Sequence, residues 1–324
     1  MSVEIMPLEQ MKTYRGTNPR PADFDEFWDR GLAQAAACET KVELKPAEFQ
    51  AKGCECFDLY FSGVDGARIY AQYLRPAGVS EKVPVVFWFH GYSGNSGDWF
   101  TKLSWVQQGF AVAAMDCRGQ GGKSQDPGGA LGSTYIGHII RGLDDSAEKL
   151  LFRQTFLDTV MLVRAVSAFS EIDETRMAVY GGSQGGGLSL VCAALNPQIC
   201  CAAVQFPFLC DYKRVYDLDC MGSAYEELRY FFRTADPRHE RETEFFTRLG
   251  YIDVQYLAER IRADVLWGTA LKDQACPAST QFAAYNRLTC KKEMVIYPDF
   301  GHEDIRDYMD LGFQFVCRHL RRAD

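Results

Sequence analysis

Short apolar runs recur along the chain and are separated by longer segments with helical periodicity. Six runs are nearly continuous, which is typical of strands that are covered on both faces of a sheet: residues 83–90, 110–115, 177–181, 202–206, 263–269 and 293–297. Two earlier runs, at 55–62 and 67–74, alternate between apolar and polar positions. They flank Gly63-Val64-Asp65-Gly66 and therefore predict a β-hairpin.

The segments between these runs have the spacing of amphipathic helices. Helices are predicted at residues 22–37, 99–107, 150–169, 188–195, 278–288 and 305–320. Strands that alternate with helices in this way predict an α/β fold with a mostly parallel central sheet flanked by helices. We expect a single domain over residues 1–324.

Two segments stand outside this alternation. Residues 1–50 are turn-rich with one helix, and we expect them to form an N-terminal arm that packs onto the core. Residues 210–255, after the sixth predicted strand, are helical, charged and rich in aromatic side chains. This pattern fits a cap-like insertion over a site, and it fits a peripheral pair of helices equally well.

One glycine-rich turn carries the strongest chemical signal. The run at 177–181 leads into Gly181-Gly182-Ser183-Gln184-Gly185, and a short helix follows. A serine on a sharp strand-to-helix turn is typical of a hydrolase nucleophile, and a Cβ at either flanking glycine would clash with the turn. The next helix directs its free N–H groups and positive dipole end at the site. Glycine-rich turns are also common in other α/β proteins, so the serine needs partners.

A nucleophilic serine needs a general base. Downstream of Ser183 the histidines are His239, His302 and His319. His319 lies late in a predicted helix and His239 in the charged insertion, whereas His302 follows a predicted strand in a glycine-containing loop. We therefore expect His302 to be the base, in the chain order serine, acid, histidine.

Two aspartates compete to orient His302. Asp273 lies on the loop after the preceding strand, where this chain order places the acid. Asp299 is closer in sequence, but three residues in a turn give a poor geometry for holding an imidazole. We favour Asp273 and keep Asp299 as the alternative.

The loop that begins at His90 follows a central predicted strand and is rich in glycine. Such a loop can supply backbone N–H groups to an oxyanion hole, and the alternative is a plain turn. We expect the N–H groups of Tyr92 and Gln184 to stabilise the oxyanion. His90 precedes the flexible part of the loop, so we expect it to be structural.

Other polar residues near these loops have two interpretations. Asp116 and Arg118 could contact a substrate, but we favour a charge pair that fixes the loop geometry. Tyr135 and His138 lie in the loop-like segment 124–145 and are candidate wall residues of a pocket.

Composition narrows the class of partner. The net charge is −8 and basic residues do not cluster along most of the chain, so we expect neither nucleic acid nor a membrane as partner. No apolar run approaches the roughly 20 residues of a membrane span, and we see no signal peptide. The twelve cysteines show no paired Cys-x-x-Cys spacing and the five histidines do not lie at ligand spacing from them. We expect buried, reduced thiols, no metal and no other cofactor.

Several short motifs are distributed along the chain: His90-Gly91-Tyr92, Arg118-Gly119-Gln120, Gly181–Gly186, Pro207-Phe208-Leu209-Cys210, Pro277 with Ser279-Thr280, Phe282–Asn286 and His302-Glu303. Together they resemble the acetyl xylan esterase and cephalosporin-C deacetylase family of α/β-hydrolases. The combination of Arg-Gly-Gln, Gly-x-Ser-Gln-Gly and His-Glu is much more specific than the serine turn alone.

The resemblance implies a serine esterase that removes acetyl groups from small acetylated sugars, especially xylo-oligosaccharides, and from cephalosporin-type antibiotics. It places the nucleophile, acid and base at Ser183, Asp273 and His302. It places the oxyanion donors at Tyr92 and Gln184. It also implies a cytoplasmic homohexamer whose active sites face an inner chamber.

Further roles follow from the same motifs. The resemblance makes Arg118-Gly119-Gln120 a structural signature, and we expect Glu303 to be structural as well, as a carboxylate near the start of the closing helix. We expect Tyr92, Pro207 and Phe208 to contact the substrate.

Rival functions remain. A general short-chain carboxylesterase would use the same residues. A serine peptidase of the prolyl-oligopeptidase type shares the turn and the triad order, but it usually carries a large extra domain before the hydrolase unit, where this chain has about 80 residues. A non-enzymatic binding protein is disfavoured because competent residues fill all three triad positions.

Overall fold

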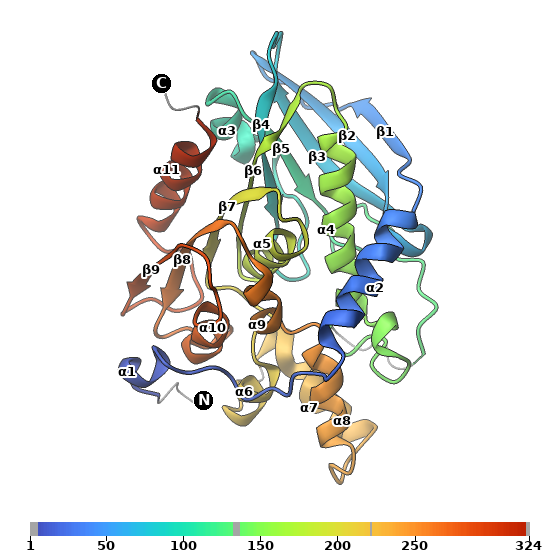
Figure 1. The fold of residues 1–324 in the computed structure, drawn as a ribbon, viewed down its shortest axis with the longest axis vertical. Helices are drawn as coiled ribbons and strands as arrows, with labels where there is room; N and C mark the ends of the chain where they lie inside the picture. Colours follow the sequence, from blue (N-terminus) through green and yellow to red (C-terminus); the bar gives the residue numbers. More distant parts are fainter. Residues whose placement is uncertain (1–5, 132–136, 221, 322–324) are drawn as a thin grey trace.

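The computed structural model describes residues 6–131, 137–220 and 222–321, and this part of the chain forms one nine-stranded sheet with helices on both faces (Figure 1). The strands are β1 Val42–Pro46, β2 Cys54–Ser62, β3 Arg68–Pro76, β4 Val83–Phe89, β5 Ala111–Met115, β6 Ile172–Gly182, β7 Ile199–Gln205, β8 Asp264–Ala270 and β9 Lys292–Tyr297.

The strand order is β1-β2-β3-β5-β4-β6-β7-β8-β9. The pairs β1–β2, β2–β3 and β3–β5 are antiparallel, and all the other pairs are parallel. The mostly parallel sheet and the predicted hairpin are therefore confirmed. Parallel strands end at a common edge of the sheet, so the loops that follow β4, β6 and β8 meet there.

One strand was not predicted. Residues 42–46 were assigned to the N-terminal arm, but they form β1 and pair with β2, with Leu44 opposite Leu59. β1 is an edge strand whose side chains are largely exposed, so it contains no apolar run. The sheet interior imposes a hydrophobic pattern, whereas an edge strand can be polar.

The helices lie close to the predicted segments. They are α1 Leu8–Met11, α2 Phe24–Ala37, α3 Leu103–Gln107, α4 Leu151–Ser167, α5 Gln184–Leu195, α6 Tyr212–Asp217, α7 Glu226–Thr234, α8 Glu242–Gly250, α9 Val254–Leu257, α10 Ala278–Tyr285 and α11 Tyr308–Leu320. Residues 99–102 form a 3₁₀ turn ahead of α3 rather than its first turn. The closing helix begins three residues later than expected, because Asp307 has a φ of 81° and cannot continue a helix.

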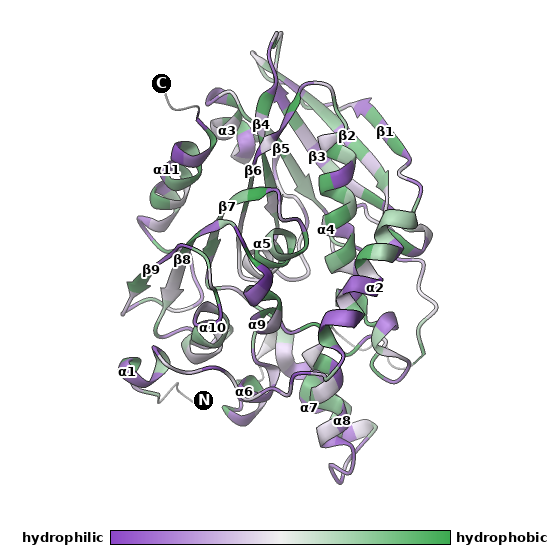
Figure 2. Cartoon of the chain, viewed as in Figure 1, coloured by the Kyte–Doolittle hydropathy of each residue, from purple (hydrophilic) through white to green (hydrophobic). Residues whose placement is uncertain are grey.

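Alternate residues of the central strands pack into two separate cores. Val85 and Phe87 of β4 belong to the core beneath α4 and α5, whereas Val86 belongs to the core beneath α3 and α11. In Figure 2, hydrophobic colour predominates in α4 and the central strands, while α2 and α11 mix hydrophobic and hydrophilic turns. The sheet is therefore rigidly covered on both faces, which fixes the positions of the loops at its edge.

The segment 210–255 contains α6, α7 and α8, which gather at one end of the sheet, and α9 begins at its close (Figure 1). The N-terminal arm is tied to this segment through Asp211, which is fully buried. The backbone N–H of Asn18 donates to Asp211 Oδ1 at 2.8 Å, and the Tyr14 hydroxyl donates to Asp211 Oδ2 at 2.7 Å. The arm and the insertion are thus packed onto one another as well as onto the core.

Arg118 does not pair with Asp116, so that part of the sequence interpretation is wrong. The Arg118 guanidinium is buried and donates to both carboxylate oxygens of Asp158 in α4, each at 2.6 Å. Asp116 instead accepts hydrogen bonds from the backbone N–H groups of Ser96 and Lys123. Both residues fix loop geometry, but through different partners.

We expect Arg118→Met to destabilise the protein strongly. The substitution leaves the buried Asp158 carboxylate without its cation, and breaking a buried ion pair on one side typically costs about 3–5 kcal/mol. The free energy of unfolding in urea should fall by about that amount. The double variant Arg118→Met/Asp158→Asn should recover part of the loss, and a double variant no more stable than the single one would contradict this account.

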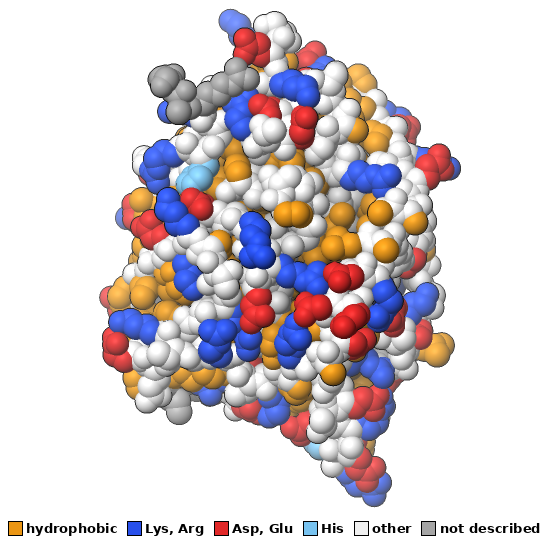
Figure 3. Space-filling view, in the orientation of Figure 1, with side chains coloured by type: hydrophobic (Ala, Val, Ile, Leu, Met, Phe, Trp, Pro, Cys, Tyr) orange, Lys and Arg blue, Asp and Glu red, His pale blue; other side chains and the backbone are white. Residues whose placement is uncertain are grey.

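The surface in Figure 3 carries Lys and Arg side chains interspersed with Asp and Glu. Ion pairs such as Arg260 with Asp25, at 2.9 Å, belong to this mixed pattern. In the described ranges, no helix has the length and apolar character that crossing a membrane requires.

Candidate active site

Ser183 lies on the turn between β6 and α5, at the carboxyl edge of the sheet. Its backbone has a φ of 56° and a ψ of −123°, a conformation that a residue with a side chain rarely adopts. The Ser183 N–H donates to the Gln205 carbonyl at 3.0 Å, and the Ser183 carbonyl accepts from the Phe208 N–H at 3.0 Å. The neighbouring strand β7 and the loop after it therefore hold the strained turn in place.

The flanking glycines are required by space, as predicted. A Cβ at Gly181 would lie 2.5 Å from the carbonyl carbon of Gly185, and a Cβ at Gly185 would overlap the carbonyl oxygen of Phe89. β4, β6 and the start of α5 can approach this closely only because both residues lack a side chain.

His302 and Asp273 are brought together from two loops at the same edge. The His302 Nδ1 lies 2.9 Å from Asp273 Oδ2, and Asp273 is 2% exposed. Asp273 Oδ1 accepts from the backbone N–H groups of Ala275 and Cys276 at 2.9 and 2.7 Å. The loop after β8 therefore fixes the carboxylate, and the second oxygen remains for the imidazole.

Asp299, the alternative acid, does not contact His302 in a comparable way. Its carboxylate is exposed and pairs with Lys272 Nζ at 2.6 Å. The Lys272 ammonium lowers the pKa of this carboxyl group. The geometry therefore places Asp273 next to the imidazole and Asp299 at the surface.

Ser183 and His302 line one cavity of about 360 Å³. The rest of its wall comes from four loops and contains His90, Gly91, Tyr92, Gly94, Asn95, Phe208, Gly222, Ala224, Ala275 and Cys276. The Phe206 ring lies 4.5 Å from the His302 ring, which limits the rotation of the imidazole. A volume of this size suits a small molecule.

Tyr92 lies in the loop after β4, and Gln184 directly follows Ser183 on the serine turn. Tyr92 lines the cavity, and Gln184 is the first residue of α5, where backbone N–H groups lack partners within the helix. The Gln184 side chain is buried and exchanges two hydrogen bonds with the amide of Gln120, at 2.9 and 3.0 Å. The Arg-Gly-Gln motif thus braces the residue after Ser183.

His90 is held by the backbone. Its Nε2 accepts from the Cys117 N–H at 3.0 Å, and its Nδ1 lies 2.7 Å from the Gly91 carbonyl. Burial lowers the pKa of His90, so the neutral ring that these two contacts require is favoured. This geometry fits the structural role expected for His90.

Only some of the residues expected to contact the substrate line the cavity. Phe208 lines the cavity and packs against Tyr92 with 5.5 Å between ring centres. Pro207 is buried and is not among the residues that line the cavity. His138 packs on Tyr92, at 5.1 Å between ring centres, and is not among the residues that line the cavity. Tyr135 lies outside the described residues.

Glu303 does not belong to the first turn of a helix, because α11 begins only at Tyr308. Its carboxylate instead accepts from the Gly301 N–H at 3.0 Å. Glu303 therefore closes the short loop that presents His302, a structural contact different from the helix-dipole contact that we expected.

Cys276 was not singled out from the sequence. It is buried, lines the cavity and contacts the Ser183 side chain, and burial raises the pKa of its thiol far above the ordinary value. Its spacing after Asp273 in Asp-x-x-Cys-Pro is the only signal in the sequence. In the described part of the chain, Asp273, Cys276 and His302 form one group whose donor atoms lie within 4.8 Å of one another. The carboxylate is already engaged on both oxygens and burial keeps the thiol protonated, so these residues fit a metal poorly.

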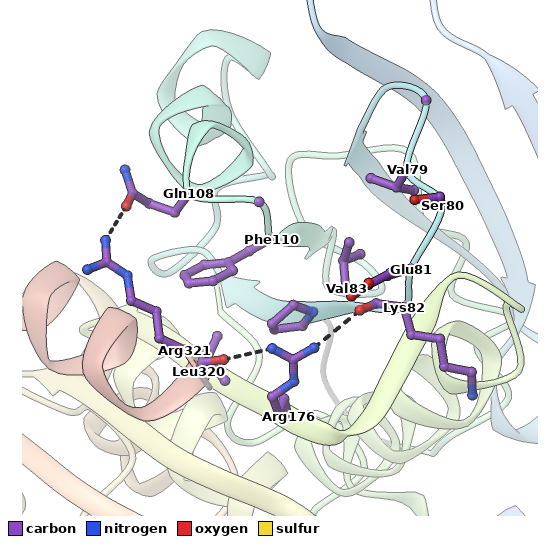
Figure 4. A pocket seen from close by; sticks show the side chains of 13 residues that line it. Val79, Ser80, Glu81, Lys82, Val83, Gln108, Phe110, Arg176, Leu320 and Arg321 are labelled. Atoms are coloured by element: carbon purple, nitrogen blue, oxygen red, sulfur yellow. Dashed lines mark hydrogen bonds between the residues drawn. The ribbon is translucent and has the colours of Figure 1, made fainter. Parts of the chain in front are cut away.

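A larger pocket, of about 580 Å³, lies at the opposite edge of the sheet (Figure 4). There the Arg176 guanidinium donates to the carbonyls of Leu320 and Lys82, both at 3.2 Å. The Arg321 side chain donates to Gln108. This pocket lies at the amino ends of the strands, away from the edge where parallel sheets bind ligands.

The strand order and the serine turn after β6 define the class: the chain is an α/β hydrolase, and the predicted fold class is confirmed. More distant solved structures share this fold alone. Pyrococcus horikoshii acylaminoacyl peptidase, at 15% identity and a TM-score of 0.60, is matched over 91% of this chain and 44% of that one.

Closer comparisons show the family. A family model described as acetyl xylan esterase matches residues 1–319. The structure of acetyl xylan esterase 1 from Thermoanaerobacterium sp. JW/SL YS485 is 54% identical, with a TM-score of 0.96 over 98% of this chain and 99% of that one. The acetyl xylan esterase from Paenibacillus sp. R4 is 35% identical, with a TM-score of 0.93 over 97% and 100%. The chain belongs to the acetyl xylan esterase family, as its motifs predicted.

A further relative is longer than this chain. The acetyl esterase Axe7A of Xylanibacter ruminicola is 26% identical over 302 residues, which cover 91% of this chain and 65% of that protein.

Proposed function

We propose that this protein is a serine esterase that removes acetyl groups from small acetylated carbohydrates, xylo-oligosaccharides in particular. The observation that carries the proposal is the contact between buried Asp273 and His302, which lines the same cavity as Ser183 in a chain of the acetyl xylan esterase family. The family relatives named as acetyl xylan esterases support the substrate class.

In the first half-reaction, the Ser183 Oγ attacks the acetyl carbonyl carbon and His302 takes the hydroxyl proton. Asp273 holds the imidazole in the required tautomer and stabilises the imidazolium. The N–H groups of Tyr92 and Gln184 stabilise the oxyanion of the tetrahedral intermediate. The intermediate collapses, the carbon–oxygen bond to the sugar breaks, and His302 returns its proton to the sugar oxygen.

In the second half-reaction, the acetyl group stays on Ser183 while the sugar leaves. His302 then takes a proton from water, whose oxygen attacks the acetyl carbon. Collapse of the second tetrahedral intermediate releases acetate and returns the proton to Ser183. The proposed steps use neither a metal nor another cofactor.

The size and lining of the cavity suit a substrate with a small acyl group and a small leaving group. Tyr92 and Phe208 supply aromatic surface beside Ser183, and glycines or alanines from the insertion, Gly222 and Ala224, line another part. Aromatic rings pack against the apolar faces of sugars and of fused-ring antibiotics alike. We therefore extend the proposal to the acetyl ester of cephalosporin C.

The test compares acyl chains and leaving groups. We expect steep loss of kcat/KM from p-nitrophenyl acetate to butyrate to octanoate, acetate release from acetylated xylobiose and from cephalosporin C, and no cleavage of peptide anilides. Efficient hydrolysis of the octanoate with indifference to the sugar would point to a general carboxylesterase. Cleavage of the anilides would point to a peptidase.

Assembly and placement in the cell are proposed from the family resemblance. We infer a cytoplasmic homohexamer of one hydrolase domain, with residues 210–255 as a cap that borders each active site. Light scattering on the purified protein measures the assembly, and a mass other than six chains would contradict it.

A further inference from the structure

Glu227 is a buried carboxylate on α7 that the mechanism above does not use. It is 1% exposed, although it belongs to the insertion rather than to the central sheet. A buried carboxylate is costly unless donors surround it, so its partners indicate what it holds in place.

Four hydrogen bonds converge on this carboxylate. Oε1 accepts from the Tyr92 hydroxyl at 3.1 Å and from the backbone N–H groups of His138 and Ile139 at 2.9 and 3.0 Å. Oε2 accepts from the N–H of Ile140 at 2.9 Å. All four donors are neutral, and together they suit the ionised form, which only accepts. Burial raises the pKa of Glu227 to about 7 against the opposing effect of these bonds.

The contact with Tyr92 is fixed from two sides. The Tyr92 hydroxyl donates to Glu227 and also accepts from the His138 N–H at 3.0 Å. Gly137 leaves the space for this arrangement, because a Cβ there would overlap the Glu227 carboxylate and lie 2.8 Å from the Tyr92 hydroxyl oxygen. The Tyr92 hydroxyl is therefore held by Glu227 and the His138 N–H, while the residue still lines the cavity.

The same helical segment supports the other aromatic wall of the cavity. Tyr225, two residues before Glu227, packs on Phe208 with 4.4 Å between ring centres, and Phe208 packs on Tyr92. The insertion thus reaches the cavity through Glu227 on one side and Tyr225 on the other.

From this geometry we propose that Glu227 is a positioning residue for the oxyanion hole. It holds the Tyr92 side chain, and through it the backbone N–H of Tyr92, in line with the oxyanion that forms on Ser183. This inference rests on the proposed function and gives the insertion a role in it: α7 carries the anchor of the oxyanion loop.

The test begins with Glu227→Gln and its matched control Glu226→Gln, an exposed neighbour on the same helix. The NH₂ group of glutamine is a donor, so at one of the four contacts two donors would face each other. The loop that carries Tyr92 should therefore shift. We expect kcat on p-nitrophenyl acetate to fall about 10–100-fold with KM within about threefold, because a small misplacement of a transition-state donor affects mainly the chemical step. Affinity for a boronic acid that forms a tetrahedral adduct with serine should fall in parallel. Glu226→Gln should match the wild type.

Tyr92→Phe removes the hydrogen bond between the Tyr92 hydroxyl and Glu227 but leaves the buried carboxylate in place. It keeps the Tyr92 backbone N–H and the three backbone bonds to Glu227, so the fold should persist. We expect kcat to fall about 10-fold, with KM unchanged, and the double variant Tyr92→Phe/Glu227→Gln to be no slower than Glu227→Gln alone. If the two substitutions lowered kcat independently, so that their effects multiplied in the double variant, the proposal would be overturned. A Glu227→Gln enzyme with a lower melting temperature but wild-type kcat would also overturn it.

Ser183→Ala in the same assays distinguishes a failure of the proposed esterase function from a failure of the role proposed for Glu227. Activity that survives in Ser183→Ala would overturn the proposed function itself. An inactive Ser183→Ala beside a Tyr92→Phe enzyme with wild-type kcat would overturn only the role of Glu227.

Discussion

Ser183→Ala should abolish esterase activity, with kcat reduced by about 10⁶-fold, the loss typical of removing a triad serine. Alanine removes only the hydroxyl oxygen, and the backbone bonds from Gln205 and Phe208 that hold the turn do not involve the side chain. The protein should therefore fold and bind substrate normally. Release of p-nitrophenol, with circular dichroism to confirm folding, measures both effects.

Two further variants sharpen this result. Ser93→Ala, at an exposed serine in the loop beside the cavity, should retain activity within about threefold, since the Ser93 hydroxyl lies at a long 3.4 Å from His138 Nε2. Ser183→Gly should be as inactive as Ser183→Ala but more stable by about 1 kcal/mol, because glycine tolerates the positive φ at this position. Substantial activity in either Ser183 variant would contradict the account.

Asp273→Asn should lower kcat by about 10⁴-fold, the loss known for the same change in a serine protease triad. The asparagine oxygen can still accept from the N–H groups of Ala275 and Cys276, so its NH₂ group would face His302. A donor there stabilises the tautomer that cannot take the serine proton. The effect should appear in kcat with a small change in KM, measured on p-nitrophenyl acetate.

Asp299→Asn is the matched control. Asp299 is exposed and pairs with Lys272, and exposed ion pairs contribute little. We expect activity within about twofold of the wild type. The reverse pattern, with Asp299→Asn inactive and Asp273→Asn active, would transfer the acid role to Asp299.

Most of the sheet could be predicted because interior strands must be apolar on both faces. Runs such as 83–90 and 110–115 have no other stable location in a chain of this size. β1 escaped prediction because an edge strand is half exposed, so Val42–Pro46 can alternate charged and apolar residues without penalty. The start of α11 was placed early because the sequence does not reveal the positive φ of Asp307.

The candidate triad could be proposed from the sequence because hydrolases of this fold place nucleophile, acid and base in a fixed chain order on loops of one edge. Ser183, Asp273 and His302 each follow a strand, and the sequence shows both the strand and the residue type. Cys276 could be found only by its spacing from Asp273, since a buried thiol looks like any other core residue.

Partners that are distant in the chain could not be predicted. Asp158, the partner of Arg118, occupies an ordinary polar position of an amphipathic helix 40 residues away. Glu227 lies 135 residues from Tyr92, in a segment whose aromatic pattern fits either a cap or a peripheral pair of helices. Only the fold shows that this carboxylate contacts Tyr92 and the backbone N–H groups of residues 138–140.

In the proposed mechanism, Ser183 becomes covalently acylated. The most direct test treats the purified protein with an organophosphate ester, which leaves a stable phosphoryl group on an activated serine, and maps the modified peptide by mass spectrometry. We expect one phosphoryl group per chain, on Ser183, with loss of activity in proportion and no labelling of Ser183→Ala. An inactivated protein with an unmodified Ser183, or with the label on another residue, would contradict it.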